Sequence, residues 1–151
     1  MLARLKKSLD EKDQGFTLIE LLIVIVIIGI LAAIAIPLFL SQREKGVDSG
    51  VKSDVRALAG IQESLAVDGG YSSLDADIQA AKFNKTEGNV IAVKTSTDAF
   101  CIQGSNEKGS RKGTEGGYFW YDSTLGGLQS GENAPTGGAC AAITTAFVPV
   151  S

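Results

Sequence analysis

The sequence predicts an α+β protein in which one long N-terminal helix packs, along its second half, on a small antiparallel sheet. Three observations carry this prediction. An uncharged run, Leu21–Leu40, lies near the N-terminus. Apolar residues then recur every three or four positions as far as Val67, as in an amphipathic helix. Residues 89–151 hold short β-rich segments between glycine-rich turns. With 151 residues, the chain has room for one domain beyond the helix.

The composition argues against an enzyme, a metal or cofactor protein and a nucleic-acid-binding protein. The chain contains no His, the commonest general base and metal ligand in proteins. A formal charge of −3 gives no broad attraction to nucleic acid, so nucleic acid is not indicated as a partner. The sequence shows no nucleophile–base pair, phosphate-binding loop or metal-binding cluster. We therefore expect neither an enzyme nor a cofactor or metal site.

Residues 1–15 form a short charged segment before the apolar run. A basic flank ahead of the first apolar helix favours keeping that end in the cytoplasm, which places the C-terminal part outside. A secretory signal peptide would end its apolar core, about 7–15 residues long, with an A-x-A-like cleavage site. No such site ends the run here, so the helix is expected to persist. The basic residues of the segment are Arg4, Lys6, Lys7 and Lys12.

The junction with the apolar run reads Gly15-Phe16-Thr17-Leu18-Ile19-Glu20. This box resembles that of the type IV pilin family, which includes the pseudopilins of type II secretion and DNA-uptake machines. In that family a short basic leader ends in Gly and is followed by an aromatic residue, T-L-I-E and a long apolar helix. The match is complete over the box, and the resemblance is strong from Gly15 to about Arg43 and only general beyond it. It implies that a prepilin peptidase cuts between Gly15 and Phe16 and N-methylates Phe16.

The resemblance also implies a role for Glu20. Cleavage creates an amine on Phe16, and in the family the carboxylate of one subunit pairs with that amine of a neighbour. One helical turn separates the two residues, so pairing within one chain is also sterically open. A lone Glu at the edge of a span would instead face headgroups and water. A carboxylate in an apolar bundle is costly unless it is paired, and the complete box favours the assembly charge pair.

Leu21–Leu40 reaches about 30 Å as a helix, enough to cross a bilayer core. Gly29 and Pro37 interrupt this run, and a Pro inside a helix removes a backbone hydrogen bond. Two interpretations stay open. Membrane helices tolerate such residues, or Gly29 and Pro37 mark a helix break, a weak segment that stretches or melts when subunits pack outside the membrane.

Residues 41–68 continue the helix with one apolar face, and Asp68-Gly69-Gly70 ends it. A short helix with a capping residue is expected from Ser72–Asp77. The paired aspartates Asp75 and Asp77 are better explained by that first turn than by calcium. Asn84-Lys85-Thr86 matches the N-glycosylation triplet, which is a weak motif. The apolar face consists of Val47, Val51, Val55, Leu58, Ile61 and Leu65.

The predicted sheet has three clear strands and a short fourth one. Because successive strand residues face opposite sides, Phe119 and Tyr121 should share one face, with Trp120 on the other. We expect core and covering roles for these rings rather than a ligand platform. The loop 105–117, with Lys108, Arg111 and Lys112, reads as solvated rather than as a DNA-binding patch. The predicted strands are 89–95, 99–103, 118–122 and 125–129.

Cys101 and Cys140 fit an extracytoplasmic domain. Two thiols without His are too few for a zinc site, and their spacing is no redox motif. A disulfide between them would close a loop of about 40 residues and stabilise the fold by roughly 4 kcal/mol in the chain-entropy model. The resemblance to pilins implies such a C-terminal disulfide loop.

Together these features predict a structural pilus subunit. The expected parts are a removed leader (1–15), a membrane and filament-core helix (16–40), its amphipathic continuation (41–68) and an extracytoplasmic head (69–151). The resemblance implies other pilin subunits, a prepilin peptidase, an inner-membrane platform protein and an assembly ATPase as partners. The precursor would cross the membrane once, and the assembled filament would be extracellular. The alternatives are a pseudopilin and, from a different class, a membrane-tethered binding domain that does not polymerise.

Overall fold

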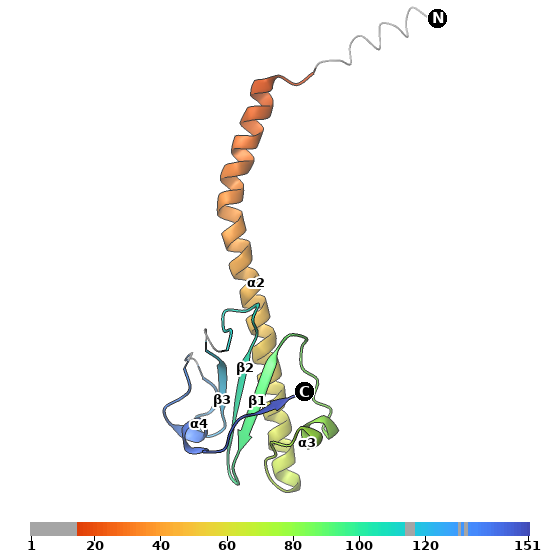
Figure 1. The fold of residues 1–151 in the computed structure, drawn as a ribbon, viewed down its shortest axis with the longest axis vertical. Coiled ribbons are helices and arrows are strands. Elements are labelled where there is room, and N and C mark those ends of the chain that lie inside the picture. Colours follow the sequence, from red (N-terminus) through yellow and green to blue (C-terminus); the bar gives the residue numbers. More distant parts are fainter. Residues whose placement is uncertain (1–14, 114–116, 130, 132) are drawn as a thin grey trace, which may run out of the picture. The chain divides into compact units, whose positions relative to one another are not determined.

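The fold, shown as a computed structural model in Figure 1, is described for residues 15–113, 117–129, 131 and 133–151. The chain divides into two compact units, Met1–Leu40 and Ser41–Ser151, which we describe separately. The α+β prediction is confirmed, with a long N-terminal helix and a five-stranded antiparallel sheet.

Helix α2 (Leu18–Asp68) contributes its first part to the first unit and its second part to the second unit. It is continuous through Gly29 and Pro37, so the structure shows no break at either residue. At its C-terminal end the N–H groups of Gly69 and Gly70 donate to the Leu65 carbonyl, at 3.1 and 3.2 Å. Gly70 has φ +126°, a backbone conformation that glycine adopts most easily and that ends the helix where the sequence predicted.

The sheet of the second unit has the strand order β4-β3-β2-β1-β5, and all neighbours are antiparallel. The three main predicted strands are present within two residues at each end. The fourth is shorter than expected, and β5 was not predicted because three residues around Pro149 carry almost no strand pattern. The strands are β1 (Val90–Thr95), β2 (Phe100–Ser105), β3 (Phe119–Asp122), β4 (Gly127–Leu128) and β5 (Val148–Val150).

The second half of α2 covers one face of this sheet (Figure 1). Val51, Val55 and Leu58 of the helix are fully buried, as the apolar pattern predicted. The alternation predicted for β3 is confirmed: Phe119 and Tyr121 belong to this core, whereas Trp120 packs in a second cluster on the opposite face. The sheet residues of the first core include Ile91, Val93, Phe100, Ile102, Phe119 and Val150.

Polar residues share the buried face of α2, which the apolar pattern did not predict. Asp48 accepts hydrogen bonds from the N–H and hydroxyl groups of Ser110, at 2.9 and 2.5 Å. Asn106, in the same loop, is only 7% exposed. The prediction that loop 105–117 is simply solvated is therefore wrong for these positions, because the loop is bonded to α2. Lys108 and Lys112 are exposed.

Two short helices complete the second unit. Helix α3 (Asp75–Ala80) was predicted, but its N-cap is Leu74 and no side chain caps it. The Ser72 hydroxyl instead accepts the Leu74 N–H and donates to Asp77, which orders the preceding turn. Helix α4 (Gly138–Ala142) was not predicted, because five residues of Gly, Ala and Cys carry no helical periodicity.

Candidate functional site

The first candidate site is the start of α2. Gly15, Phe16 and Thr17 are not helical, and the Phe16 side chain is 91% exposed. The predicted cleavage junction, Gly15–Phe16, therefore lies in exposed, non-helical chain immediately before the helix. The predicted leader falls almost entirely outside the described residues, which begin at Gly15.

Thr17 and Glu20 form a capping box at this helix start. The Glu20 Oε2 atom accepts the Thr17 N–H at 2.8 Å and the Thr17 hydroxyl at 2.7 Å. In return, the Glu20 N–H donates to the Thr17 hydroxyl at 3.3 Å. This is the reciprocal arrangement of a T-x-x-E box, with Thr17 as N-cap and Glu20 as the third helical residue. The capping box was not predicted, although a T-x-x-E motif ahead of an apolar run indicates one.

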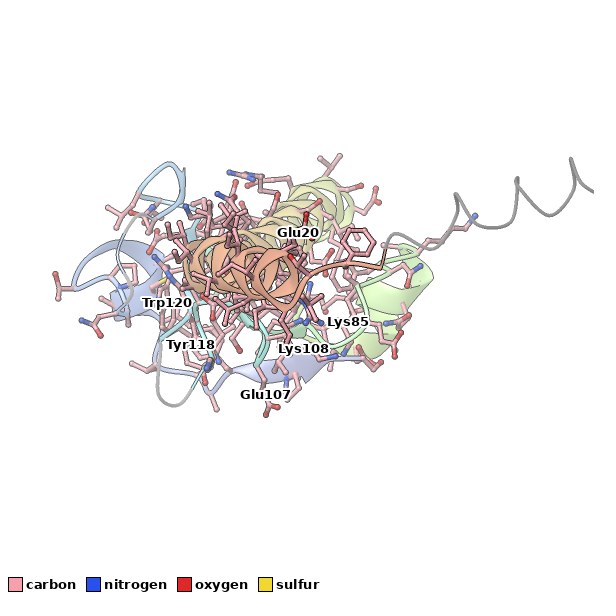
Figure 2. The ribbon with its side chains drawn as sticks, turned by 90° about the horizontal axis from the view of Figure 1, so that it is seen from above. Glu20, Lys85, Glu107, Lys108, Tyr118 and Trp120 are labelled. Atoms are coloured by element: carbon pink, nitrogen blue, oxygen red, sulfur yellow. A yellow bond between two sulfur atoms is a disulfide. The ribbon has the colours of Figure 1, made fainter. Side chains whose placement is uncertain are left out.

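Glu20, labelled in Figure 2, therefore has a local role in the single chain. Both bonds use Oε2, and within the described part of the chain Oε1 accepts no hydrogen bond. The Thr17 N–H is a backbone amide and remains one after cleavage at Phe16. One carboxylate oxygen can thus close the capping box while the other faces a cationic donor.

The apolar part of α2 presents its side chains outward. From Leu21 to Leu40 the large apolar residues are each at least half exposed. Among the described residues, α2 is the one helix long and apolar enough to cross a membrane by length and composition. A Cβ at Gly29 would meet no other heavy atom within 4 Å, so nothing within this unit requires a glycine there.

The second candidate site is the disulfide between Cys101 on β2 and Cys140 on α4, whose Cα atoms are 4.9 Å apart. The pairing implied by the resemblance is present. Aromatic rings cover the bond: Tyr118 and Trp120, side by side in Figure 2, have centroids 5.5 Å apart, and Phe147 packs 5.8 Å from Trp120. The disulfide is buried, with Cys101 at 0% and Cys140 at 6% exposure.

Two buried charged residues flank this disulfide, and the sequence analysis did not identify either. Asp122, fully buried, accepts N–H bonds from Ala139 and Cys140. Lys94, 8% exposed, donates to the carbonyls of Cys140 and Ile143. The two side chains bind opposite ends of the same short helix, α4.

The two charges respond differently to burial. Burial alone would raise the pKa of Asp122, but the hydrogen bonds from Cys140, Thr124, Ala139 and Leu125 together outweigh it and lower the pKa. Burial lowers the pKa of Lys94, and the nearby Asp122 carboxylate offsets part of that change. Asp122 is consequently held as a carboxylate, a strong acceptor for backbone N–H groups.

The weaker candidates have structural partners. Asp75 accepts bonds from Ser151, and Asp77 accepts one from Ser72, which accounts for the paired aspartates without calcium. Asn84 is exposed, but the Thr86 hydroxyl of the glycosylation triplet donates to Asp54.

Arg111 belongs to the basic residues of loop 105–117. It donates to the Tyr118 and Gly131 carbonyls and stacks 4.2 Å from the centre of the Phe119 ring, so it orders the loop rather than facing solvent.

Residues 11–36 match the family profile described as the prokaryotic N-terminal methylation motif. The chain is 35% identical to the type IV wide pilus major component PilA4 of Thermus thermophilus over 114 residues, which are 74% of this chain and 81% of that protein. It is 51% identical to the type IV major pilin protein PilA of Myxococcus xanthus over 56 residues (37% and 26%).

It is also 35% identical to the type II secretion system core protein G of Klebsiella pneumoniae over 71 residues (46% of this chain and 51% of that protein). The chain thus spans about a quarter of the Myxococcus pilin and about half of the Klebsiella protein. No solved structure matches it significantly.

Proposed function

The chain belongs to the type IV pilin family, and from this premise we propose that it polymerises into an extracellular type IV pilus. One observation carries the choice of a pilus over a pseudopilus. Similarity to a pilus major component extends over 81% of that protein, and thus into the head. The secretion-system relative is matched over 51% of its length. A pseudopilin remains the alternative, because the N-terminal motif is common to both groups.

The proposed pathway starts with a precursor that crosses the inner membrane once through residues 16–40, with its N-terminus in the cytoplasm. A prepilin peptidase removes residues 1–15 and methylates the new amine of Phe16. The non-helical, exposed Gly15–Phe16 junction supports this step, because a peptidase needs access to the backbone that it cuts. A platform protein and an assembly ATPase then move the subunit into the filament, with the head outward.

Within the filament we assign Glu20 to the amine of Phe16 on a neighbouring subunit. The outward-facing apolar side chains of α2 need partners once they leave the membrane, and helices of other copies supply them. An unpaired amine among such helices would be costly. The Oε1 atom of Glu20 takes no part in the capping bonds and is left to accept that amine. Gly29 and Pro37 remain proposed as the segment of α2 that adjusts when helices pack.

The experiment is to shear fibres from the cell surface and identify their subunits by mass spectrometry and N-terminal sequencing. A pilus subunit should be recovered from the fibres with N-methylated Phe16 at its N-terminus. Absence from surface fibres, with the processed protein kept in the cell envelope, would contradict the pilus and favour the pseudopilus. A retained Met1 would contradict processing at Gly15.

Three variants separate the charge of Glu20 from its capping role. Glu20→Gln keeps the capping box, since Gln also serves at this position, but removes the charge, so fibres should be lost while processing continues. Glu20→Ala removes both and should fail equally. Thr17→Val is the matched control: it removes the hydroxyl of the box and keeps the carboxylate, so fibres should persist. Normal fibres from Glu20→Gln, with none from Thr17→Val, would show that capping rather than charge matters.

A further inference from the structure

Three side chains form one row across the sheet, on the face opposite to α2. Lys94 on β1 is paired with Cys101 on β2, and Cys101 is paired with Asp122 on β3. Neighbouring strands lie about 4.8 Å apart, and paired residues project to the same face. The row therefore holds an ammonium, a disulfide sulfur and a carboxylate in that order, and α4 packs on both β2 and β3.

Asp122 binds the N-terminal end of α4. Its Oδ1 atom accepts the Ala139 N–H at 3.0 Å, and its Oδ2 atom accepts the Cys140 N–H at 2.7 Å. Gly138 precedes them with φ +68°, and a Cβ there would lie 2.7 Å from both carboxylate oxygens. A side chain at this position would displace the carboxylate, so the glycine lets the backbone approach Asp122 closely.

Asp122 is itself fixed on its own strand end. The N–H and hydroxyl groups of Thr124 donate to Oδ1 at 2.9 and 2.8 Å, and the Leu125 N–H donates at 3.0 Å. These bonds involve residues next to β3 and none from α4. The carboxylate is therefore held by the turn that follows β3 as well as by α4.

Lys94 binds the other end of α4. Its ammonium donates to the Cys140 carbonyl at 2.7 Å and to the Ile143 carbonyl at 2.9 Å, and it lies 4.9 Å from the centre of the Phe147 ring. A carboxylate at the N-terminal end and an ammonium at the C-terminal end complement the unpaired backbone groups of a helical turn. Cys140, between them, faces the middle member of the row, Cys101.

We propose that Asp122 and Lys94 are positioning residues for disulfide formation, which dock α4 on the sheet and present Cys140 to Cys101 before the bond exists. All four hydrogen bonds use backbone groups of α4 or of Ile143, the residue that follows it, so none depends on the cysteine sulfurs. The covalent bond then fixes an arrangement that the two charges have already selected.

The chemical step requires an external disulfide as oxidant, and glutathione disulfide serves in vitro. The Cys101 thiolate attacks glutathione disulfide, forms a mixed disulfide and releases one glutathione thiolate. The Cys140 thiolate then attacks the Cys101 sulfur and releases the second glutathione. Two protein thiols lose two electrons and two protons in total, and one glutathione disulfide becomes two glutathione molecules. The docking residues act on the second, intramolecular step.

The first test measures the thiol–disulfide equilibrium of Cys101 and Cys140 in the full chain, dissolved in detergent, against buffers of reduced and oxidised glutathione. If docking presents Cys140, Asp122→Asn should lower the effective concentration of the cysteine pair by at least about tenfold, because it removes charge-assisted bonds to two backbone amides. Lys94→Met should also lower the effective concentration, because it removes the bonds at the C-terminal end of α4. An effective concentration unchanged in both variants would overturn the proposal.

Asp54→Asn is the matched control for this measurement. Asp54 is also a buried carboxylate, 7% exposed, and accepts bonds from Thr86 and Asn89 rather than from α4. It should destabilise the head yet leave the glutathione equilibrium within about twofold of the unmodified protein, since it does not touch the docked turn. An equal fall in Asp54→Asn would show that general destabilisation, and not positioning, sets the equilibrium.

The second test starts from protein that cannot form the disulfide. In full-length protein carrying Cys101→Ala and Cys140→Ala, hydrogen exchange of the backbone amides at 139 and 140 should remain slow, because their acceptor is the Asp122 carboxylate. Adding Asp122→Asn should raise their exchange to the rate of exposed amides while β1 and β2 amides stay protected. Fast exchange at 139 and 140 in the cysteine-free protein would show that the disulfide, not the charges, docks α4.

Discussion

Gly104 on β2 is the closest point between the sheet and α2. A Cβ built at this position would lie 2.6 Å from Val55 Cγ2, 2.9 Å from Val51 Cγ1 and 2.9 Å from Ile91 Cδ1. Carbon atoms in contact prefer about 3.5–4.0 Å, so a methyl group there would require displacements of up to roughly 1 Å. All three neighbours belong to fully or almost fully buried residues. We therefore predict that Gly104→Ala destabilises the head.

Two opposing contributions set the size of this effect. Overpacking a filled core costs about 1–3 kcal/mol. Replacing Gly in a strand recovers about 0.5–1 kcal/mol of backbone entropy. The net loss in free energy of unfolding should be up to about 2.5 kcal/mol, and each kcal/mol lowers the Tm by roughly 4–8 °C in a small domain. Trp120, the single Trp of the chain, lies on the opposite face of the sheet and reports unfolding without touching Gly104.

The assay is thermal unfolding of the full chain in detergent, followed by Trp fluorescence. Gly60→Ala is the matched control: a Cβ there meets nothing within 4 Å, and Gly60 lies inside α2, so the same substitution should stabilise by up to about 1 kcal/mol. Val55→Ala alone should cost about 2 kcal/mol. The double variant Val55→Ala with Gly104→Ala should lose at least about 1 kcal/mol less than the two single variants added together, because Val55→Ala removes the methyl group nearest to the new Cβ. Strict additivity, or a Tm raised by Gly104→Ala, would refute the close approach.

Two further predictions concern buried polar groups. The accepted hydrogen bonds place the pKa of Asp122 below its unfolded value of about 3.9, so its contribution is complete above that value and is lost as the pH falls through the folded-state pKa. The Tm difference between the unmodified protein and Asp122→Asn should thus shrink below about pH 4, and a constant difference would contradict this. Gln62→Met should lower the free energy of unfolding by about 1–3 kcal/mol, because it leaves the Ser72 N–H and carbonyl unpaired. Gln79→Met, which loses exposed bonds to Ser151 and Asp75, should have a clearly smaller effect on urea unfolding, and equal effects would contradict the assignment.

The parts of the fold predicted from sequence are those with a repeating apolar pattern. Helix α2 follows from an uncharged run joined to a three-and-four spacing, and β1, β2 and β3 follow from alternation. The short elements α4 and β5 have no such pattern. They exist because contacts with distant residues hold them: β5 pairs with β1, and α4 is fixed by the row on the sheet. Those contacts join residues that are far apart in the sequence, so local propensity does not predict them.

At the start of α2 the sequence indicated an intermolecular role for Glu20 and concealed a local one. The resemblance to pilins implied that Glu20 pairs with a Phe16 amine, whereas the T-x-x-E spacing also predicts a capping box. The capping box uses Oε2 alone, so the proposed pairing with a neighbour's amine through Oε1 is compatible with it.

Lys94 and Asp122 were difficult to identify because polar residues on the outer face of a strand normally face water. Cys101 lies between them in the cross-strand register, on the same face. A half-cystine on that face must be covered by the segment that brings its partner, and a segment large enough to cover Cys101 also covers its nearest neighbours on β1 and β3. Buried charges need hydrogen bonds, and a short helical turn offers unpaired N–H groups at one end and carbonyls at the other. The strand register together with the disulfide therefore predicts that Lys94 and Asp122 are buried, which neither the register nor the cysteine spacing predicts alone.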